Sequence, residues 1–126
     1  MTLVIDASAL LALLREEPGA DLVAQHVRHS AISTVNLTEV IEIVEMHGGN
    51  AGEVIAAVAR LEVDIIPFAE RHSVLAAAYR PRVKGKNISL ADRCCWALAA
   101  ALESPVLTGD RDWVGLDHGL EIKPIR

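Results

Sequence analysis

Residues 2–16 read TLVIDASALLALLRE, and this stretch decides the class of fold. Its first part, Thr2–Ile5, is uncharged, rich in β-branched side chains and followed by Asp6, which predicts a buried strand. Ala7–Glu16 then places leucines at helical spacing, and Pro18-Gly19 ends the predicted helix. A buried strand followed directly by a helix is the repeating unit of sheets whose strands run parallel.

The alternation of strand and helix continues along the chain. Short apolar runs predict further strands at Ala31–Val35, Val63–Phe68, Val106–Thr108 and Leu120–Ile125. Apolar residues at helical spacing predict helices at Ala20–His29, Asn36–Gly48, Asn50–Leu61, Ala69–Tyr79 and Ser89–Leu102, with a loop at Arg80–Asn87. Three of these helices begin with a polar residue and an acid three positions later, as in a capping box: Asn36–Glu39, Asn50–Glu53 and Ser89–Asp92. We therefore expect an α/β fold of three layers, α/β/α, around a central, mostly parallel sheet of about five strands.

The composition indicates one folded domain. The 126 residues, 52% of them hydrophobic and 23% charged, suit a single domain over residues 1–126 and exclude general disorder. The 12 basic and 17 acidic residues leave a net charge of −5. This balance argues against a protein that coats nucleic acid by bulk charge, although a local basic groove remains compatible with it.

The cysteines indicate a reducing compartment. Cys94 and Cys95 are adjacent, and neighbouring residues of a helix cannot reach disulfide geometry. The longest apolar run at helical spacing, Cys94–Leu102, is much shorter than the ~20 residues that span a bilayer. We therefore expect a cytoplasmic protein without a membrane segment.

Four acidic residues occupy positions that a parallel sheet would bring to one edge, at the carboxyl ends of its strands. Asp6 ends the first predicted strand and Asp110 follows the fourth, while Glu39 and Asp92 fall in the first turns of predicted helices. In such sheets the carboxyl ends of strands and the N-termini of the following helices share one edge. Four carboxylates in one pocket repel one another, and a hard divalent cation such as Mg²⁺ or Mn²⁺ relieves that repulsion. The pattern predicts a metal site that can assist hydrolysis of a phosphodiester.

Each acid also has a purely structural interpretation. Asp6, Glu39 and Asp92 are suitable N-caps for their helices, a role that needs no ligand. Asp110 and Asp112 belong to the turn-forming sequence GDRD at residues 109–112. The four acids together at one edge are much more specific for function than any one of them.

Four segments resemble the motifs of PIN-domain ribonucleases. They are VIDASAL at residues 4–10, NLTEV at 36–40, LAD at 90–92 and LTGDRDW at 107–113. Their order and spacing cover the chain from Val4 to Trp113, and its length matches the minimal form found in VapC-like toxins of type II toxin–antitoxin systems. The resemblance implies a PIN-like fold.

The resemblance also implies an Mg²⁺- or Mn²⁺-dependent endoribonuclease. It assigns Asp6, Asp92 and Asp110 to metal binding, with Glu39 completing the shell or orienting the attacking water. Ser8 and Thr108 match hydroxyl groups near the first and fourth acids, and Asp112 is a possible extra acid. Hydrolysis by water would leave 5′-phosphate and 3′-hydroxyl ends on the RNA. For a toxin, the resemblance further implies a homodimer and a cognate antitoxin protein.

Basic residues near the predicted site suggest how an acidic protein holds RNA. They are Arg80, Arg82, Lys84 and Lys86 in the loop before the Asp92 helix, and Arg93 and Arg111 beside two of the acids. They are suited to bind backbone phosphates. The structural interpretation of the loop is a solvated charged segment.

Three other functions compete with the toxin. A PIN nuclease of RNA maturation or decay would carry the same acids without an antitoxin. A binding module that merely retains the fold would not need the complete acid set. A phosphoacceptor receiver also gathers acids around Mg²⁺, but it needs an aspartate after the third strand, where this chain has Ile66-Pro67-Phe68.

Overall fold

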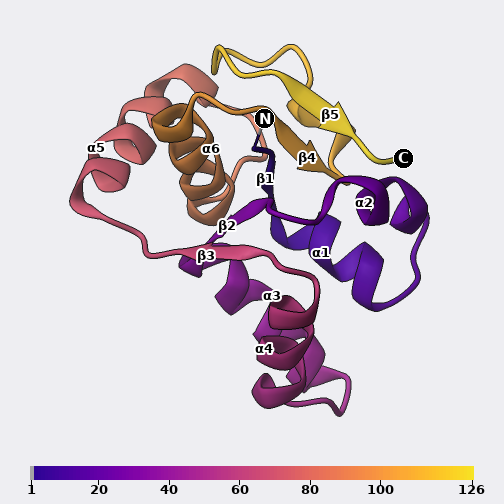
Figure 1. Ribbon diagram of the computed structural model, residues 1–126. Coiled ribbons are helices and arrows are strands. Elements are labelled where there is room, and N and C mark those ends of the chain that lie inside the picture. The colour runs from indigo at the N-terminus through magenta and orange to yellow at the C-terminus, as the bar shows by residue number, and fades with distance from the viewer. Residues whose placement is uncertain (1) are drawn as a thin grey trace.

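The computed structural model describes residues 2–126, and within them five strands form one sheet (Figure 1). The strands are β1 (Val4–Ile5), β2 (Ala31–Ser33), β3 (Asp64–Ile66), β4 (Val106–Thr108) and β5 (Ile122–Pro124). They lie in the order β3-β2-β1-β4-β5, and every neighbouring pair is parallel. The predicted α/β class and the predicted number of strands are confirmed, and the sheet is parallel throughout.

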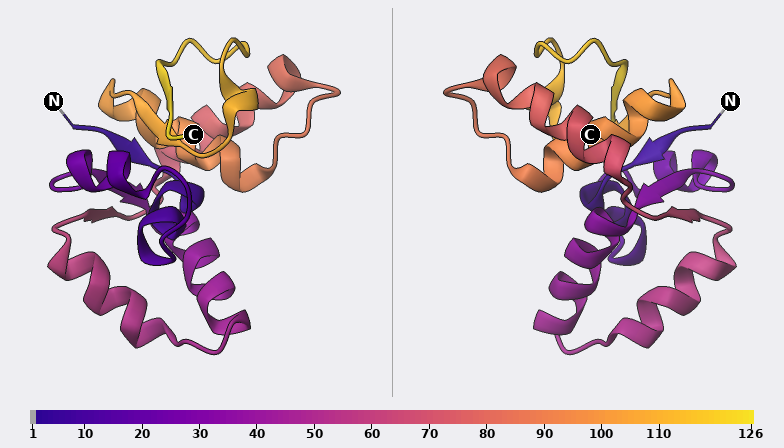
Figure 2. Two further views of the ribbon diagram at one scale, coloured as in Figure 1. Left: turned by 90° about the vertical axis from the view of Figure 1, so that its right-hand side faces the viewer. Right: turned by 90° about the vertical axis from the view of Figure 1, so that its left-hand side faces the viewer.

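Helices cover both faces of this sheet, which confirms the predicted three layers. They are α1 (Ala7–Leu14), α2 (Ala20–His26), α3 (Thr34–Met46), α4 (Ala51–Arg60), α5 (Glu70–Tyr79) and α6 (Leu90–Leu102), with short 3₁₀ turns η1 (Arg80–Val83) and η2 (Arg111–Trp113). Figure 2 shows α3 and α4 as a hairpin that projects away from the sheet. None of the helices within residues 2–126 is both long and apolar enough to cross a membrane.

The alternation of side chains along the strands produces two cores. Ile5 and Leu107 point to the face covered by α1 to α4, where they pack with Leu10 and Val40. Their neighbours Val4 and Val106 point to the opposite face, in a core with Trp96, Tyr79 and Trp113. The Trp96 ring meets Trp113 edge to face, with centroids 5.5 Å apart. The strands β1, β2 and β4 therefore each contribute to both layers of packing.

The start of α3 differs from the sequence prediction. The helix begins at Thr34, where Ser33 Oγ accepts from Val35 N at 3.2 Å, so the predicted cap at Asn36 was wrong. Serine and asparagine are equally good N-caps, and the local sequence does not distinguish them. Asn36 instead lies within the helix, where its Nδ2 donates to Glu39 Oε1 at 2.9 Å and to Ala91 O in α6 at 3.1 Å.

The other boundaries agree with the predictions to within a few residues. The strands predicted at Val63–Phe68 and Leu120–Ile125 are each shortened to three residues. The predicted loop after α5 contains the 3₁₀ turn η1. The capping box of α6 is formed as predicted, and Asn50 caps α4 through Oδ1, which accepts from Glu53 N at 3.0 Å.

Candidate active site

A hollow of about 260 Å³ lies at the carboxyl ends of β1 and β4. All four acids predicted from the sequence line it, together with Ser8 and apolar side chains: Asp6, Glu39, Asp92, Asp110, Leu11, Ile43 and Trp113. The parallel pairing of β1 with β4 brings the ends of these two strands together. The topology thus collects acids from four separate segments around one space.

Asp6 is the buried member of this set, with 6% of its surface exposed. It caps α1, because Oδ1 accepts from Ala9 N at 2.9 Å. Ser8 Oγ donates to Oδ1 at 2.7 Å, and Thr108 Oγ1 donates to Oδ2 at 2.6 Å. Burial raises the pKa of Asp6 to about 6, against the lowering effect of the Thr108 and Ser8 hydroxyls. The structural and functional interpretations of Asp6 are therefore compatible.

The two predicted hydroxyl groups link β1 to β4. Ser8 Oγ lies 3.4 Å from Thr108 Oγ1 and also accepts from Gly109 N at 2.8 Å. Thr108 Oγ1 accepts from Asp110 N at 3.0 Å. This network holds the segments that carry Asp6 and Asp110 in fixed register.

Asp92 and Glu39 occupy the helical side of the hollow. Asp92 belongs to the capping box of α6, in which Ser89 N donates to Asp92 Oδ2 at 3.0 Å. Glu39 is not in the first turn of α3, and its Oε1 accepts from Asn36. Burial raises the pKa of both acids, and the charge of a neighbouring carboxylate adds to the rise, that of Asp110 at Asp92 and that of Asp92 at Glu39. The acids are therefore close enough to repel one another.

The last acidic segment contributes one residue to the hollow. Asp110 Oδ1 accepts from Asp112 N at 3.0 Å and so caps η2. Asp112 itself is exposed and is not among the residues that line the hollow. The role of Asp112 as an extra acid has no geometric support from the hollow.

The donors of this hollow suit a hard divalent cation, because they are carboxylate and hydroxyl oxygens under mutual repulsion. Each of the four acids nevertheless already accepts a hydrogen bond from its own chain. Within the described residues 2–126, no group of three His, Cys, Asp or Glu side chains stands in a metal-ligating arrangement. A carboxylate can accept several hydrogen bonds, so these caps leave oxygen lone pairs for an ion, but the acid side chains would have to converge on it.

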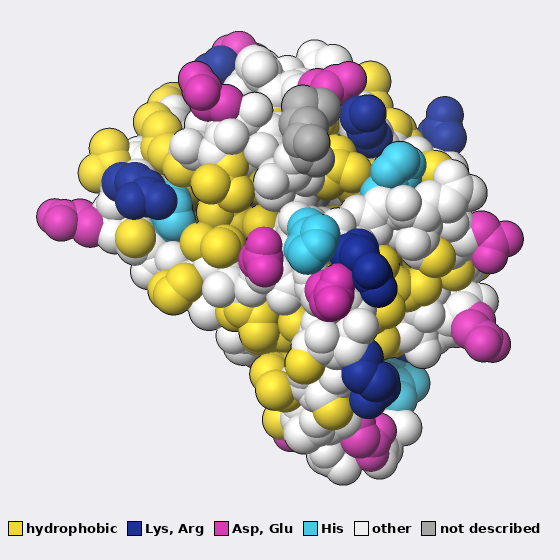
Figure 3. All heavy atoms as spheres, viewed as in Figure 1, with side chains coloured by type: hydrophobic (Ala, Val, Ile, Leu, Met, Phe, Trp, Pro, Cys, Tyr) yellow, Lys and Arg dark blue, Asp and Glu magenta, His cyan; other side chains and the backbone are white. Residues whose placement is uncertain are grey.

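The basic residues predicted to contact RNA are dispersed. Arg82 pairs with Asp117 at 2.9 Å, and its neighbours Arg80, Lys84 and Lys86 are exposed but do not line the hollow. Arg93 is buried, and its Nη1 donates to Ala76 O at 2.8 Å. Figure 3 shows basic, acidic and apolar side chains intermixed on one face of the molecule. That face carries no continuous basic surface.

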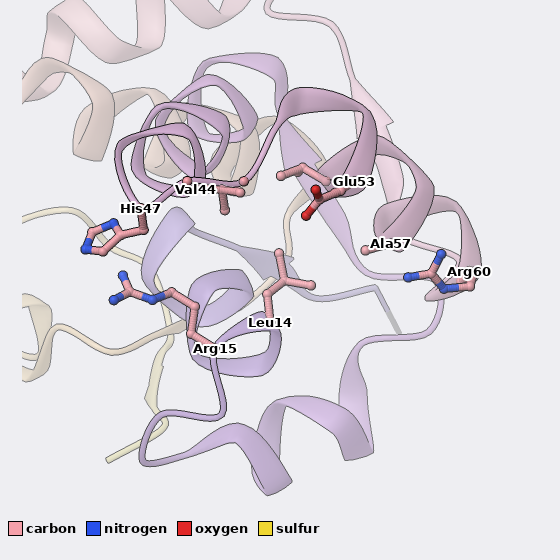
Figure 4. A pocket seen from close by; sticks show the side chains of 10 residues that line it. Leu14, Arg15, Val44, His47, Glu53, Ala57 and Arg60 are labelled. Carbon is pink, nitrogen blue, oxygen red and sulfur yellow. The ribbon is translucent and has the colours of Figure 1, made fainter.

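A second hollow, of about 510 Å³, lies between the ends of α1 and α3 and the helix α4 (Figure 4). It is lined by Leu14, Arg15, Val44, His47, Gly48, Gly49, Glu53, Val54, Ala57 and Arg60. Its single carboxylate, on Glu53, accepts from Asn50 Nδ2 at 2.9 Å. This hollow is larger than the first, but it lacks the set of acids that metal-assisted hydrolysis needs.

One residue beside the first hollow was not predicted from the sequence. The guanidinium of Arg126 lies against Gly109, the residue between Thr108 and Asp110. No local motif surrounds Arg126, and its position depends on the pairing of β5 with β4. Only the tertiary structure brings it to the site.

Comparison with known proteins connects this geometry to a family. The model of the PIN domain matches residues 3–119. Ribonuclease VapC30 of Mycobacterium tuberculosis and VapC ribonuclease Mb0640 of Mycobacterium bovis are each 30% identical over 126 residues, which cover 91% of this chain and 95% of the relative. A solved toxin–antitoxin complex from Klebsiella pneumoniae contains a chain with the same fold, with a TM-score of 0.79 and 18% identity over 98% of this chain and 97% of the other.

Proposed function

We propose that this chain, which belongs to the PIN-domain family and within it to the VapC ribonucleases, cleaves RNA internally with the help of a bound divalent metal ion. One observation carries the proposal. The carboxylates of Asp6, Glu39, Asp92 and Asp110 line one hollow at the carboxyl ends of β1 and β4.

Asp6, Asp92 and Asp110 would hold the ion, and Glu39 would complete their set. Mg²⁺ and Mn²⁺ are the expected ions, because both prefer carboxylate oxygens. When bound, such an ion supplies Lewis-acid chemistry that offsets negative charge on the phosphodiester. It would also relieve the repulsion between carboxylates, which adds to the effect of burial in raising the pKa values of Asp92 and Glu39.

The protein side chains supply positioning and proton transfer. The hydroxyls of Ser8 and Thr108 hold Asp6 in one orientation and favour its ionised form against burial. Glu39, whose pKa is raised, is suited to orient the attacking water and to accept a proton from it. Because water and not the RNA 2′-hydroxyl is the nucleophile, the products carry 5′-phosphate and 3′-hydroxyl ends.

Contacts with the RNA backbone are assigned to basic residues around the site. Arg80, Lys84, Lys86 and Arg111 remain candidates, and Arg82 would first have to leave Asp117. Arg93 is no longer a candidate, because it is buried and its guanidinium is bonded to Ala76 O. The interspersed charges on the face drawn in Figure 3 favour recognition of RNA shape by a few phosphate contacts.

Cleavage of total RNA tests the proposal directly. Wild type and Asp6→Asn are compared with Mg²⁺, with Mn²⁺ and with a chelator, and the RNA ends are mapped. Asparagine keeps the cap of α1 and removes the charge. We expect cleavage only by wild type with metal. The matched control is Asp21→Asn, an exposed acid of α2 that should leave cleavage unchanged.

Equal cleavage by wild type and Asp6→Asn would remove the assigned role of Asp6. Products with cyclic 2′,3′-phosphate ends would exclude water as the nucleophile. Cleavage that persists in the chelator would exclude metal dependence.

We also propose that the chain acts as the toxin of a toxin–antitoxin pair in the cytoplasm. A cognate antitoxin protein would place a basic side chain among the four acids and so occupy the metal and substrate site. Growth arrest on expression should be relieved by Asp6→Asn and by co-expression of a small neighbouring gene. If expression does not arrest growth, the alternative of RNA maturation or decay is favoured.

A homodimer is part of the same proposal. Two helical segments of the chain, 69–79 and 97–101, are Ala-rich and so permit close packing of helices. In α6, Ala97 and Ala99 are fully buried in the protein core, so these two side chains cannot contribute to an interface. In α5, Val74, Ala77 and Ala78 are exposed and remain available. Light scattering on wild type and Val74→Glu would show whether a dimer forms and whether α5 contributes to it.

A further inference from the structure

We propose that Arg126 is a phosphate-binding residue of this site, an inference that rests on the proposed nuclease function. Its guanidinium lies against Gly109, between Thr108 and Asp110. A Cβ placed on Gly109 would lie 2.8 Å from Arg126 Nη2, 3.0 Å from Cζ and 3.1 Å from Ser8 Oγ. The cation therefore occupies the space that a side chain at residue 109 would fill, beside the network that orients Asp6.

The backbone around Arg126 is held in place by its neighbours. Ile125 is buried, and its N–H donates to Thr108 O at 2.9 Å, which extends the pairing of β5 with β4. Arg111 Nη1 donates to Arg126 O at 2.8 Å. These two contacts attach the segment to both sides of Asp110.

The side chain of Arg126 is held from a third direction. Its Nη1 donates to Pro18 O, in the loop between α1 and α2, at 2.9 Å. The following Gly19, with a φ of +96°, lets Ile125 pass close by, because a Cβ there would lie 2.6 Å from Ile125 O. Figure 1 shows the end of the described chain beside α2. The guanidinium is thus oriented by the fold before any ligand arrives.

The charge of Arg126 is not neutralised by a carboxylate. Within the described residues 2–126, neither Arg126 nor Arg111 belongs to an ion pair, although four acids line the adjacent hollow. The side chain of Arg126 is bonded to the backbone carbonyl of Pro18 instead, and that of Arg111 to the main-chain oxygen of Arg126. By contrast, Arg82 and Arg28, which lie away from the hollow, are paired with Asp117 and Glu62.

These observations point to an anionic ligand with oxygen acceptors. The Nη1 of Arg126 is used for positioning, while Nη2 lies towards Gly109 and makes no hydrogen bond within residues 2–126. A guanidinium with a free N–H edge matches a phosphate oxygen better than an ammonium does. A phosphate of the RNA backbone that enters the acid-lined hollow would pass this edge, and Arg126 would offset its charge beside the acids.

RNA binding by cleavage-inactive protein tests this role. Arg126→Gln and Arg126→Lys are each made in the Asp6→Asn background, and the dissociation constant for a single-stranded RNA is measured by fluorescence anisotropy from low to moderate salt. We expect Arg126→Gln to weaken binding about 10-fold and to lower the slope of log K against log salt by about 0.7, the value for one phosphate contact. Arg126→Lys should retain part of the affinity.

The control is Arg28→Gln in the same background, because Arg28 carries the same charge away from the hollow and is paired with Glu62. It should change neither the affinity nor the slope, and circular dichroism should show all variants folded. If Arg126→Gln behaves like Arg28→Gln, the inference is overturned while the nuclease proposal stands. If wild type and Asp6→Asn cleave RNA equally, the nuclease proposal fails, whatever the binding slopes are.

Discussion

Thr108 Oγ1 donates a 2.6 Å hydrogen bond to Asp6 Oδ2, which joins the ends of β4 and β1 across 102 residues of sequence. The acceptor is a buried carboxylate, and burial raises its pKa to about 6. The hydrogen bond from Thr108 lowers this pKa more than any other contact of Asp6 does. This hydroxyl therefore acts on both the orientation and the charge of the first acid, together with the Ser8 hydroxyl and the Ala9 N–H.

Replacing Thr108 with valine should raise the pKa of Asp6 further. The change keeps the side-chain shape and removes the donor, so it should also cost about 1.5–3 kcal/mol of stability, as for a hydrogen bond to a charged group. Carboxyl NMR titration of metal-free protein measures the pKa, and denaturant unfolding measures the stability. Thr38→Val is the control, because Thr38 makes an exposed bond to Thr34 O. An unchanged pKa of Asp6 in Thr108→Val would contradict the assigned role of the hydroxyl.

The stability of the metal-free protein should fall as the pH rises from about 4 to about 6.5. Asp6 binds its proton more tightly when folded, with a pKa of about 6 against 3.8 for the exposed side chain. The folded state therefore loses relative stability as Asp6 ionises, by about 2 kcal/mol over this range. Asp92 and Glu39, whose pKa values are also raised, contribute in the same direction.

Urea unfolding at a series of pH values with a chelator present measures this dependence. Asp6→Asn should make it markedly shallower, whereas Asp21→Asn should not. A dependence equally steep in wild type and Asp6→Asn would contradict the raised pKa of Asp6; the two are compared because His72 and Asp117, whose pKa values are lowered, act in the opposite direction in both proteins.

Mn²⁺ should raise the melting temperature of wild type at pH 7 and leave that of Asp6→Asn nearly unchanged. An ion that binds only the folded state stabilises it by mass action, by about 2.7 kcal/mol at 100 times its dissociation constant. Differential scanning fluorimetry across a range of Mn²⁺ and Mg²⁺ concentrations measures the effect. An equal shift in the two proteins would place the ion elsewhere.

Asn36→Ala should reduce RNA cleavage more than its cost in stability explains. Asn36 is buried, and its Nδ2 positions Glu39 while bonding to Ala91 O at the start of α6. Its removal should cost about 1–3 kcal/mol and release Glu39 from its orientation. Single-turnover cleavage, measured where the variant is fully folded, separates the two effects.

Asn50→Ala is the matched comparison for this prediction. Asn50 makes the equivalent bonds to Glu53 at the exposed start of α4, so its loss should cost about 1 kcal/mol without slowing cleavage. Equal cleavage rates for the two variants would show that Glu39 does not need Asn36.

The sheet and the gathering of the acids were predictable because both follow from local patterns combined with one rule of topology. Asp6 follows an apolar run and Asp110 follows another, and parallel pairing brings such ends together. The start of α3 was not predictable, since Ser33 and Asn36 are equivalent caps and the bond from Asn36 to Ala91 depends on a helix 55 residues away. The position of Arg126 beside the hollow was not predictable for a similar reason, because it depends on the register of β5 against β4 and on the close approach allowed by Gly19 and Gly109.

The central strand β1 is only two residues long, Val4 and Ile5, and each points into a different core. Deleting one residue of β1 would exchange the faces of the sheet to which the side chains before Asp6 point. Each aliphatic side chain would then enter the wrong core, and the Asp6 carboxylate would turn away from its partners. The N-terminal segment thus has almost no tolerance for insertions or deletions. An in-frame deletion there would silence the protein while leaving every acidic residue of the site in its gene.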